Sequence, residues 1–303
     1  MKFISNSYLL TIFLALFLVG CSYSRPTQET YFSNEYLFNY YSNLQASYLA
    51  RGFLKGNEQS DTINFNADIL ARNFENIALY DEYIIKNGRY VFQTTPSKLR
   101  KWLQPIRVKV IHGESIPETR RESDYQLITE YFDRIGSLIK HPIVFTDNNP
   151  NFFIIVMNVE EYRSSRGLIQ AEVGKTPKAV EESIIASSPR VLCSAYTITR
   201  DKRSSEFIRA IVALKDEQRG IMRESCVHEE IAQAMGLVND SYIARPSIFN
   251  DDEEFAFLTR HDELLLQILY DDRIELGMKV EEARPIVRQI AGELVAAEPK
   301  SNL

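Results

Sequence analysis

The sequence lacks the common motifs of nucleotide-binding proteins and has no excess of positive charge. It contains no GxxxxGK[ST] phosphate loop, no GxGxxG fingerprint and no internal repeat. A Gly-x-Ser-x-Gly nucleophile elbow is also missing. The 35 Lys and Arg residues are outnumbered by 41 Asp and Glu residues, which gives a net charge of −6. Because phosphate contacts need a basic surface, we expect no nucleic-acid partner.

Apolar and aromatic residues, in contrast, are abundant. Hydrophobic residues make up 45% of the 303 residues, charged residues 25%, and there are 17 Phe and 16 Tyr. This composition is typical of a folded globular protein and excludes a disordered polymer. No segment reads as a linker, so we expect a single globular domain over residues 35–303.

Residues 1–20 have the order of a signal peptide. Lys2 is the only charge before residue 25, and the apolar segment 8–20 is shorter than the roughly 20 residues that a membrane span needs. Leu-Val-Gly before Cys21 resembles the lipobox of bacterial lipoprotein precursors. The resemblance implies cleavage before Cys21 and covalent lipid on that residue, which anchors the protein by ~0.8 kcal/mol for each buried methylene. The alternatives are an ordinary cleaved signal peptide and an uncleaved membrane anchor.

The residues after the cleavage site indicate a compartment. Ser22 stands where Gram-negative lipoproteins kept in the inner membrane tend to have Asp, so it favours the outer membrane, facing the periplasm, in a Gram-negative host. Residues 21–34 then form a tether. Thiols outside the cytoplasm tend to oxidise, so we expect a disulfide between Cys193 and Cys226, with two separately buried thiols as the alternative.

Hydrophobic periodicity predicts an α/β fold with a mixed sheet, preceded by a helical N-terminal portion. We expect a polar loop with one short helix over residues 163–189, a hairpin turn over 200–205 and a solvated acidic loop over 251–254. The expected helices cover residues 36–50, 65–80, 122–139, 224–235, 260–270 and 279–297, and the expected strands cover residues 106–110, 142–145, 152–159, 191–199 and 207–214.

The segment from Cys226 to Asp240 carries the most informative pattern. His228-Glu229 begins like the zinc helix HExxH, but Ala232 stands at the second ligand position. Two ligands must lie four residues apart to share one helix face, so this frame fails. Moved by one residue, the pattern reads E-E-x-x-Q-x-x-G-x-x-N-D, which resembles the metzincin motif H-E-x-x-H-x-x-G-x-x-H-D.

Under this resemblance Glu230 is the candidate catalytic base and Gly236 makes the turn that brings a third ligand to the metal. The candidate binding residues, which include the three ligand positions where metzincins have His, are Glu229, Gln233, Asn239 and Asp240.

Two further stretches resemble metzincins. Residues 246–249, Pro-Ser-Ile-Phe, lie where the Met-turn would be, with Phe249 in place of Met. Residues 258–270 resemble the final metzincin helix, often L-S-x-x-D-x-x-x-x-Q-x-L-Y. The resemblance covers about residues 106–271 and implies a zincin-like fold. The whole chain also resembles an uncharacterised family of proteobacterial lipoproteins that has no assigned activity.

The chemistry of these positions argues against zinc. Catalytic zinc sites usually have at least two nitrogen or sulfur ligands, whereas Glu229, Gln233 and Asn239 offer only oxygen and one charge. Such a set suits a weakly held divalent cation, and we expect no other cofactor than the covalent lipid. Without a metal, Glu230 has no activated water to deprotonate. A plainer interpretation is an ordinary helix with acidic residues near its N-terminus.

Three functions follow from these patterns. The first is a zincin-like envelope protein without zinc proteolysis, a pseudoenzyme that binds a peptide or an envelope protein. The second is an unconventional peptidase or other hydrolase that uses Glu230. The third is a purely structural envelope protein. His228 and His261 are remaining metal-ligand candidates, although a core role is the more common fate of a single His.

Overall fold

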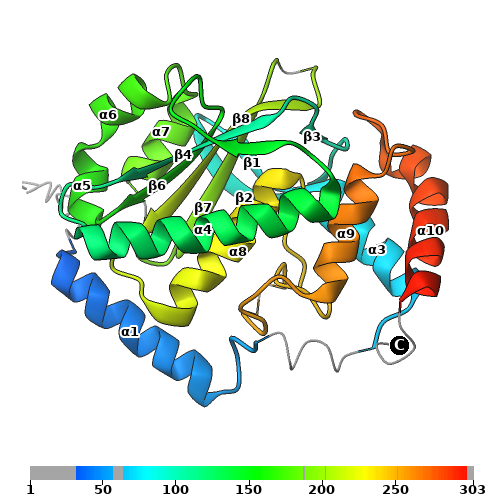
Figure 1. Ribbon diagram of the computed structural model, residues 1–303, viewed down its shortest axis with the longest axis horizontal. Coiled ribbons are helices and arrows are strands. Elements are labelled where there is room, and N and C mark those ends of the chain that lie inside the picture. Colours follow the sequence, from blue (N-terminus) through cyan, green and yellow to red (C-terminus); the bar gives the residue numbers. More distant parts are fainter. Residues whose placement is uncertain (1–31, 57–63, 187, 202, 251, 299–303) are drawn as a thin grey trace, which may run out of the picture. The chain divides into compact units, whose positions relative to one another are not determined.

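The computed structural model describes residues 32–56, 64–186, 188–201, 203–250 and 252–298 (Figure 1). The predicted signal peptide, Cys21 and most of the predicted tether lie outside these residues. The described chain is a mixed α/β structure with a helical N-terminal portion and a mostly parallel sheet, as the hydrophobic pattern predicts.

The main sheet has six strands in the order β3-β8-β6-β4-β5, with β7 paired to β8. All of these pairs are parallel except β7–β8, which is antiparallel. The expected hairpin around residues 200–205 joins these two strands. The strands are β3 Lys101–Trp102, β4 Ile106–His112, β5 Ile143–Phe145, β6 Phe152–Met157, β7 Cys193–Thr199 and β8 Glu206–Lys215.

Helices cover the sheet on both faces. Alternate side chains of its central strand point in opposite directions, so both faces carry apolar side chains that need to be covered. Every residue of β6 is buried, as expected for a central parallel strand. Phe152, Ile154 and Val156 belong to the larger core, together with residues of α4 (Glu118–Ile139), α8 (Gly220–Met235) and α9 (Arg260–Tyr270). Figure 1 shows α4 and α8 crossing the same face of the sheet.

The opposite face carries three short helices where the sequence suggests a loop with one helix. They are α5 (Val159–Ser164), α6 (Arg166–Glu172) and α7 (Lys178–Ile185). Phe153, Ile155 and Met157 of β6 pack against apolar residues of these helices. Helices of two turns are too short for a clear 3.6-residue pattern, which explains the difference.

A separate hairpin was not expected from the sequence. Strands β1 (Tyr80–Lys86) and β2 (Arg89–Pro96) pair through a turn at Asn87-Gly88, whose φ angles are 53° and 75°. Two positive φ values are the mark of a type I′ turn, and Asn-Gly is its usual sequence. On one face of this hairpin Tyr83 pairs with Phe92, which is 66% exposed.

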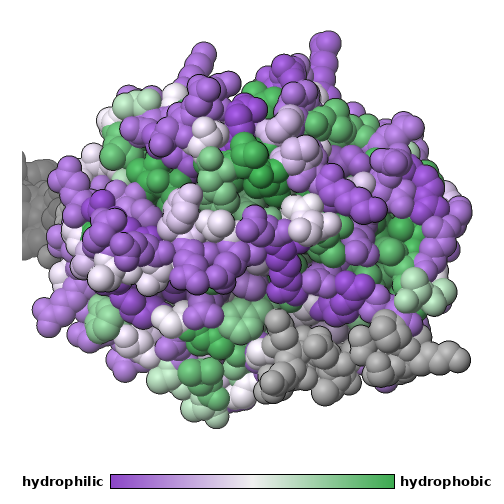
Figure 2. All heavy atoms as spheres, in the orientation of Figure 1, coloured by the Kyte–Doolittle hydropathy of each residue, from purple (hydrophilic) through white to green (hydrophobic). Residues whose placement is uncertain are grey.

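The helical N-terminal portion packs against the middle of the chain through α1 and against its last helix through α3. Helix α1 (Asn34–Ala50) buries Leu37 and Tyr41, while α3 (Ala67–Ala78) packs against α10 (Val280–Ala297). The described residues from 32 onward belong to one compact unit. None of the helices within the described ranges is long and apolar enough to cross a membrane. Side chains on the face drawn in Figure 2 are mostly hydrophilic, with small separate hydrophobic patches.

Residues near the start of the domain pair with a loop near its end. The Leu54 and Lys55 amides donate to the carbonyls of Glu253 and Glu254, and the Phe255 backbone forms a bridge with Lys55. Glu254 is buried and forms ion pairs with Lys55, at 2.7 Å, and with Arg245. Part of the acidic run is therefore a buried anchor and not a solvated loop.

Candidate functional site

Strand β7 and helix α8 lie side by side and are joined covalently. Cys193, the first residue of β7, forms a disulfide with Cys226 in the middle of α8, with a Cα–Cα distance of 5.8 Å. This is the bond expected from the sequence. Within the described residues β7 pairs with β8 alone, so it is an edge strand that is fixed against the helix carrying the predicted site residues.

Two adjacent carboxyls occupy the middle of α8. Glu230 is only 5% exposed, and its Oε2 atom has no hydrogen-bond partner among the described residues. Glu229 is half-buried. Burial, and then the charge of Asp240, raises the pKa of both carboxyls well above the usual value, and Glu82 and Glu253 act in the same direction. A carboxyl with a raised pKa is suited to proton transfer near neutral pH.

The other predicted binding residues separate into two groups after α8 ends. Gln233 Nε2 donates to Asp240 Oδ1 at 2.9 Å. Asn239 lies apart from this pair, because its backbone N–H donates to the Ile77 carbonyl and its side-chain Nδ2 donates to the Asn76 carbonyl at 2.7 Å. The structure therefore brings Gln233 to Asp240 and holds Asn239 against α3.

The turn at the end of α8 requires glycine. Gly236 has a φ of 128°, and a Cβ atom there would lie 2.4 Å from the Arg100 carbonyl oxygen. No side chain fits at that distance, and the backbone angle alone disfavours an L-residue. The role that the sequence pattern assigns to this residue, a sharp change of direction, is the role it has.

The two candidate His residues have structural partners. The His228 ring stacks on Tyr131 with centroids 4.0 Å apart, and its Nδ1 accepts the Leu258 N–H at 3.1 Å. Burial lowers its pKa to about 3, so the ring is neutral near pH 7. His261 is fully buried and its Nε2 lies 3.2 Å from Nδ2 of Asn73. Both rings therefore have structural partners, with His228 partly buried and His261 fully buried.

The loop that resembles a Met-turn is tied to α9 by one carboxylate. Asp262 accepts hydrogen bonds from the Ser247 hydroxyl at 2.5 Å and from the Ile248 and Thr259 amides, both at 3.0 Å. Phe249, at the position of Met, is fully buried in the core beneath. These contacts hold the loop 246–249 against the start of α9.

The zinc that the metzincin resemblance implies does not fit these residues. The Gln233 and Asn239 side chains are engaged with Asp240 and with a backbone carbonyl, and neither offers nitrogen as a lone-pair donor. Within the described residues no group of three or more His, Cys, Asp or Glu side chains is arranged to hold a metal ion. These residues therefore do not form a zinc site of the metzincin kind.

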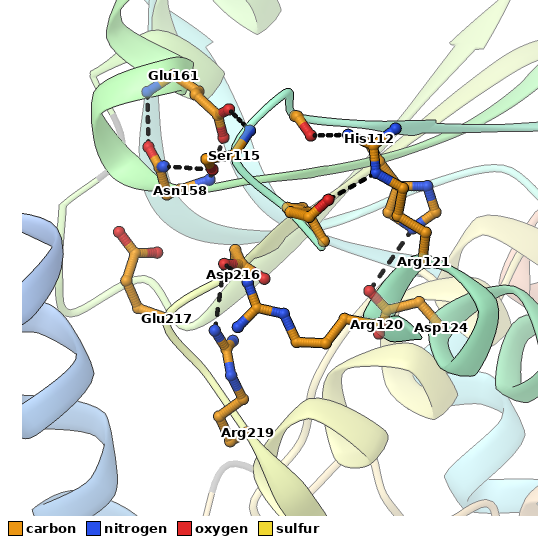
Figure 3. Close-up of polar contacts among 12 residues, drawn as sticks. His112, Ser115, Arg120, Arg121, Asp124, Asn158, Glu161, Asp216, Glu217 and Arg219 are labelled. Atoms are coloured by element: carbon orange, nitrogen blue, oxygen red, sulfur yellow. Dashed lines mark hydrogen bonds and ion pairs between the residues drawn. The ribbon is translucent and has the colours of Figure 1, made fainter. Parts of the chain in front are cut away.

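A second polar cluster lies where three parallel strands end, and the sequence patterns gave no indication of it. Asp216, directly after β8, is an ion-pair partner of Arg120 at 2.9 Å, of Arg219 at 3.2 Å and of Arg223 at 3.5 Å. Figure 3 shows Arg120 and Arg219 directed at this carboxylate. The sequence indicates this cluster only through the position of charged residues directly after strands, since such residues meet at one edge of a parallel sheet.

The same cluster continues toward β4 through longer contacts. Asp124 lies 3.6 Å from His112 at the end of β4 and 3.9 Å from Arg223. Several buried atoms here form no hydrogen bond within the described residues, among them Arg223 Nη1 and Glu217 Oε2. These contacts tie α4 to the start of α8.

Comparison with known proteins identifies a family but no activity. A family model described as a protein of unknown function, DUF2927, matches residues 67–289. No curated protein and no solved structure matches the chain.

Proposed function

This chain belongs to the DUF2927 family of proteins of unknown function, and from that premise and its own residues we propose that it is a lipid-anchored envelope protein with a zincin-like scaffold. In this proposal the scaffold binds an extended peptide segment of a partner protein along β7 and does not hydrolyse it with zinc. The observation that carries the proposal is the antiparallel edge strand β7, bonded by Cys193–Cys226 to the helix that bears Glu229 and Glu230.

The order of the strands supports a zincin-like scaffold. A sheet of parallel strands ends in one antiparallel edge strand, and the helix after the last parallel strand carries the Glu229-to-Gly236 pattern before a sharp turn. The loop 246–249, which Asp262 holds, follows α8 and precedes α9, and this order agrees with the resemblance. The replaced ligand positions argue for binding in place of zinc proteolysis.

We propose peptide binding by β-strand addition because β7, within the described residues, pairs with a strand on one side only. An edge strand presents alternate N–H and C=O groups that a second extended chain can pair with. Every residue of β7 is partly exposed, which leaves its side chains available to a neighbouring strand. The proposed partner is therefore an extended segment, recognised mainly through its backbone.

The binding test uses a labelled heptapeptide, Thr-Val-Thr-Gln-Thr-Val-Thr, and the full-length protein in detergent micelles. We expect saturable binding by fluorescence polarisation and no cleavage by mass spectrometry. Two N-methylated versions, blocked at odd or at even residues, provide matched controls. Because a paired strand donates only alternate N–H groups to its neighbour, one version should lose binding and the other should keep it. Equal binding of both versions, or of neither, would exclude strand addition.

The membrane anchor is tested separately. The mass of the mature N-terminus should show a lipidated Cys21, and Cys21→Ser should leave the protein in the soluble fraction after cell lysis. An unmodified Cys21 in the wild-type protein would refute the anchor and leave peptide binding to be judged on its own test.

A second candidate function rests on the raised pKa of Glu230. Burial raises this pKa, as enzymes do with carboxyls that transfer protons, and this favours a hydrolase that works without zinc. It predicts cleavage of an envelope peptide or polymer that Glu230→Gln abolishes. Metal content measured by elemental mass spectrometry separates both candidates from a zinc enzyme, since a stoichiometric zinc would contradict both.

A further inference from the structure

The hairpin of β1 and β2 carries a group of exposed apolar side chains. Phe92 is 66% exposed and Ile85 57%, and Val91 is exposed as well. The ring of Tyr83, which is also exposed, lies edge to face with that of Phe92, with centroids 5.9 Å apart. Single exposed apolar residues are normal on a protein, but a group of them with polar neighbours marks a surface that another molecule covers.

These side chains lie on both faces of the hairpin. Phe92 and Val91 are successive residues of one strand, so they point to opposite faces. Ile85 pairs with Tyr90, which lies on the face of Phe92 and fixes the hairpin to the domain through a ring contact with Tyr196 of β7. A protein surface docked on one face would leave the other face in water. A lipid bilayer, in contrast, surrounds a turn that enters it.

The turn between the two strands concentrates positive charge. Lys86 and Arg89 are directly paired across it, and both are exposed. Like charges directly opposite each other destabilise a pair of strands, and an anionic surface would relieve that repulsion. Segment 83–113 contains no Asp or Glu, although the whole chain has a net charge of −6. The turn end of the hairpin therefore complements a partner that is both apolar and negatively charged.

We propose that the turn end of the β1–β2 hairpin inserts into the surface of an anionic phospholipid bilayer. Phe92 then lies at the depth of the headgroups, where aromatic rings concentrate, and Lys86 and Arg89 meet lipid phosphates. The described chain begins at Phe32, eleven residues after Cys21, a separation of at most roughly 40 Å when fully extended. The inference rests on the proposed lipid anchor only to bring the domain to the membrane, and it adds the surface that meets the lipid.

The test places a fluorescent reporter on the hairpin. Phe92→Trp is made in the full-length protein, whose own Trp102 is buried and gives a constant background. The vesicles contain phosphatidylcholine with about one quarter phosphatidylglycerol, and bromine on the acyl chains quenches a Trp that enters the bilayer. We expect blue-shifted emission and strong quenching. Tyr242→Trp, at a residue outside the hairpin that is 78% exposed, is the matched control and should stay unquenched.

A second pair of variants tests the role of charge. Lys86→Gln/Arg89→Gln, made together with Phe92→Trp, should lower the ratio of quenched to unquenched Trp roughly tenfold. Lys140→Gln/Arg288→Gln removes two exposed cations outside the hairpin and should leave that ratio unchanged. A urea midpoint for each variant verifies that it is folded.

Three results would overturn the inference. Equal quenching at positions 92 and 242 would mean that the anchor alone brings the protein surface to the lipid. Quenching that survives Lys86→Gln/Arg89→Gln would mean that the anionic surface plays no part. Absence of quenching at position 92 would leave the hairpin to a protein partner, and a dimer that Phe92→Asp dissociates in analytical ultracentrifugation would identify that partner as a second copy.

The mass of the N-terminus keeps this outcome separate from that of the proposed anchor. An unmodified Cys21 would refute the anchor. Bromine quenching at position 92, measured with the same protein and vesicles, would still decide whether the hairpin inserts.

Discussion

Lowering the pH from 7.5 to 5.0 should destabilise the fold through the ring of His228. The ring is enclosed by Tyr131 and Phe257, with centroids 4.0 Å and 5.1 Å away, and its Nδ1 accepts the Leu258 N–H. Burial, and then the positive charge of Arg134, lowers the pKa of His228 to about 3. The folded protein therefore keeps this ring neutral at pH 5.

The magnitude follows from the difference between the two states. An unfolded His has a pKa of about 6.5, so at pH 5.0 the unfolded chain binds a proton at His228 that the folded chain does not. Stability rises with pH wherever the unfolded state binds more protons. The contribution of His228 is thus present above pH 6.5 and is lost as the pH falls toward 3. Between pH 7.5 and 5.0 the loss is roughly 2 kcal/mol.

The assay is urea unfolding of the wild type and of His228→Gln at both pH values. Other groups titrate in both proteins, so the difference between the two pH dependences isolates His228. The wild type should lose roughly 2 kcal/mol more than the variant. If both proteins lose the same free energy of unfolding, the His228 ring takes up a proton in the folded protein and its lowered pKa is refuted.

Three further changes test the same region. Gly236→Ala should destabilise the fold by about 3 kcal/mol in urea unfolding, because Cβ would meet a backbone carbonyl at 2.4 Å at a φ of 128°. The control Gly292→Ala, in a helix with open space around it, should be neutral or slightly stabilising. Equal effects of the two substitutions would contradict the steric argument. Replacing Cys193 and Cys226 by Ala should cost about 4 kcal/mol, since the bond closes a loop with a sequence separation of 33; reduction that leaves the urea midpoint unchanged would disprove the constraint. Glu230→Gln should raise the free energy of unfolding at pH 8 by about 1 kcal/mol. Burial raises the pKa of Glu230, so the stability that its protonated form contributes is lost as pH rises through that pKa. A lower urea midpoint of the variant at pH 8 would show that the carboxylate has an unrecognised partner.

Five of the six strands of the main sheet were predictable because they carry strong patterns, whereas the two-residue strand β3 is too short to show one. Ile106 to Val110 alternates between apolar and charged residues, and the run Phe152 to Met157 is wholly apolar, as a central parallel strand requires. The hairpin at Asn87-Gly88 has an equally clear turn signal but flanking strands that are mostly exposed, so it lacks the hydrophobic pattern that marks a half-buried strand.

The candidate site was predictable in part. The pattern around Gly236 indicated the turn, but the direction of the chain after it depends on what packs there. Asn239 is held by the carbonyls at the end of α3, which leaves Asp240 to meet Gln233. Contacts between residues about 160 positions apart cannot be read from a local motif. The same reason hid the contact between Asp216 and Arg120, which are 96 positions apart.

The pairing of Lys55 with Glu254 also has a consequence for the order in which the chain folds. The two residues are 199 positions apart, so at about 5–20 residues per second the first partner waits roughly 10–40 s for the second to be synthesised. Helix α1 waits as well, since Tyr41 donates to the Pro189 carbonyl and Gln45 accepts from the Met222 amide. Contacts of such high sequence separation form late. The segment that is synthesised first is therefore among the last to pack into the folded domain.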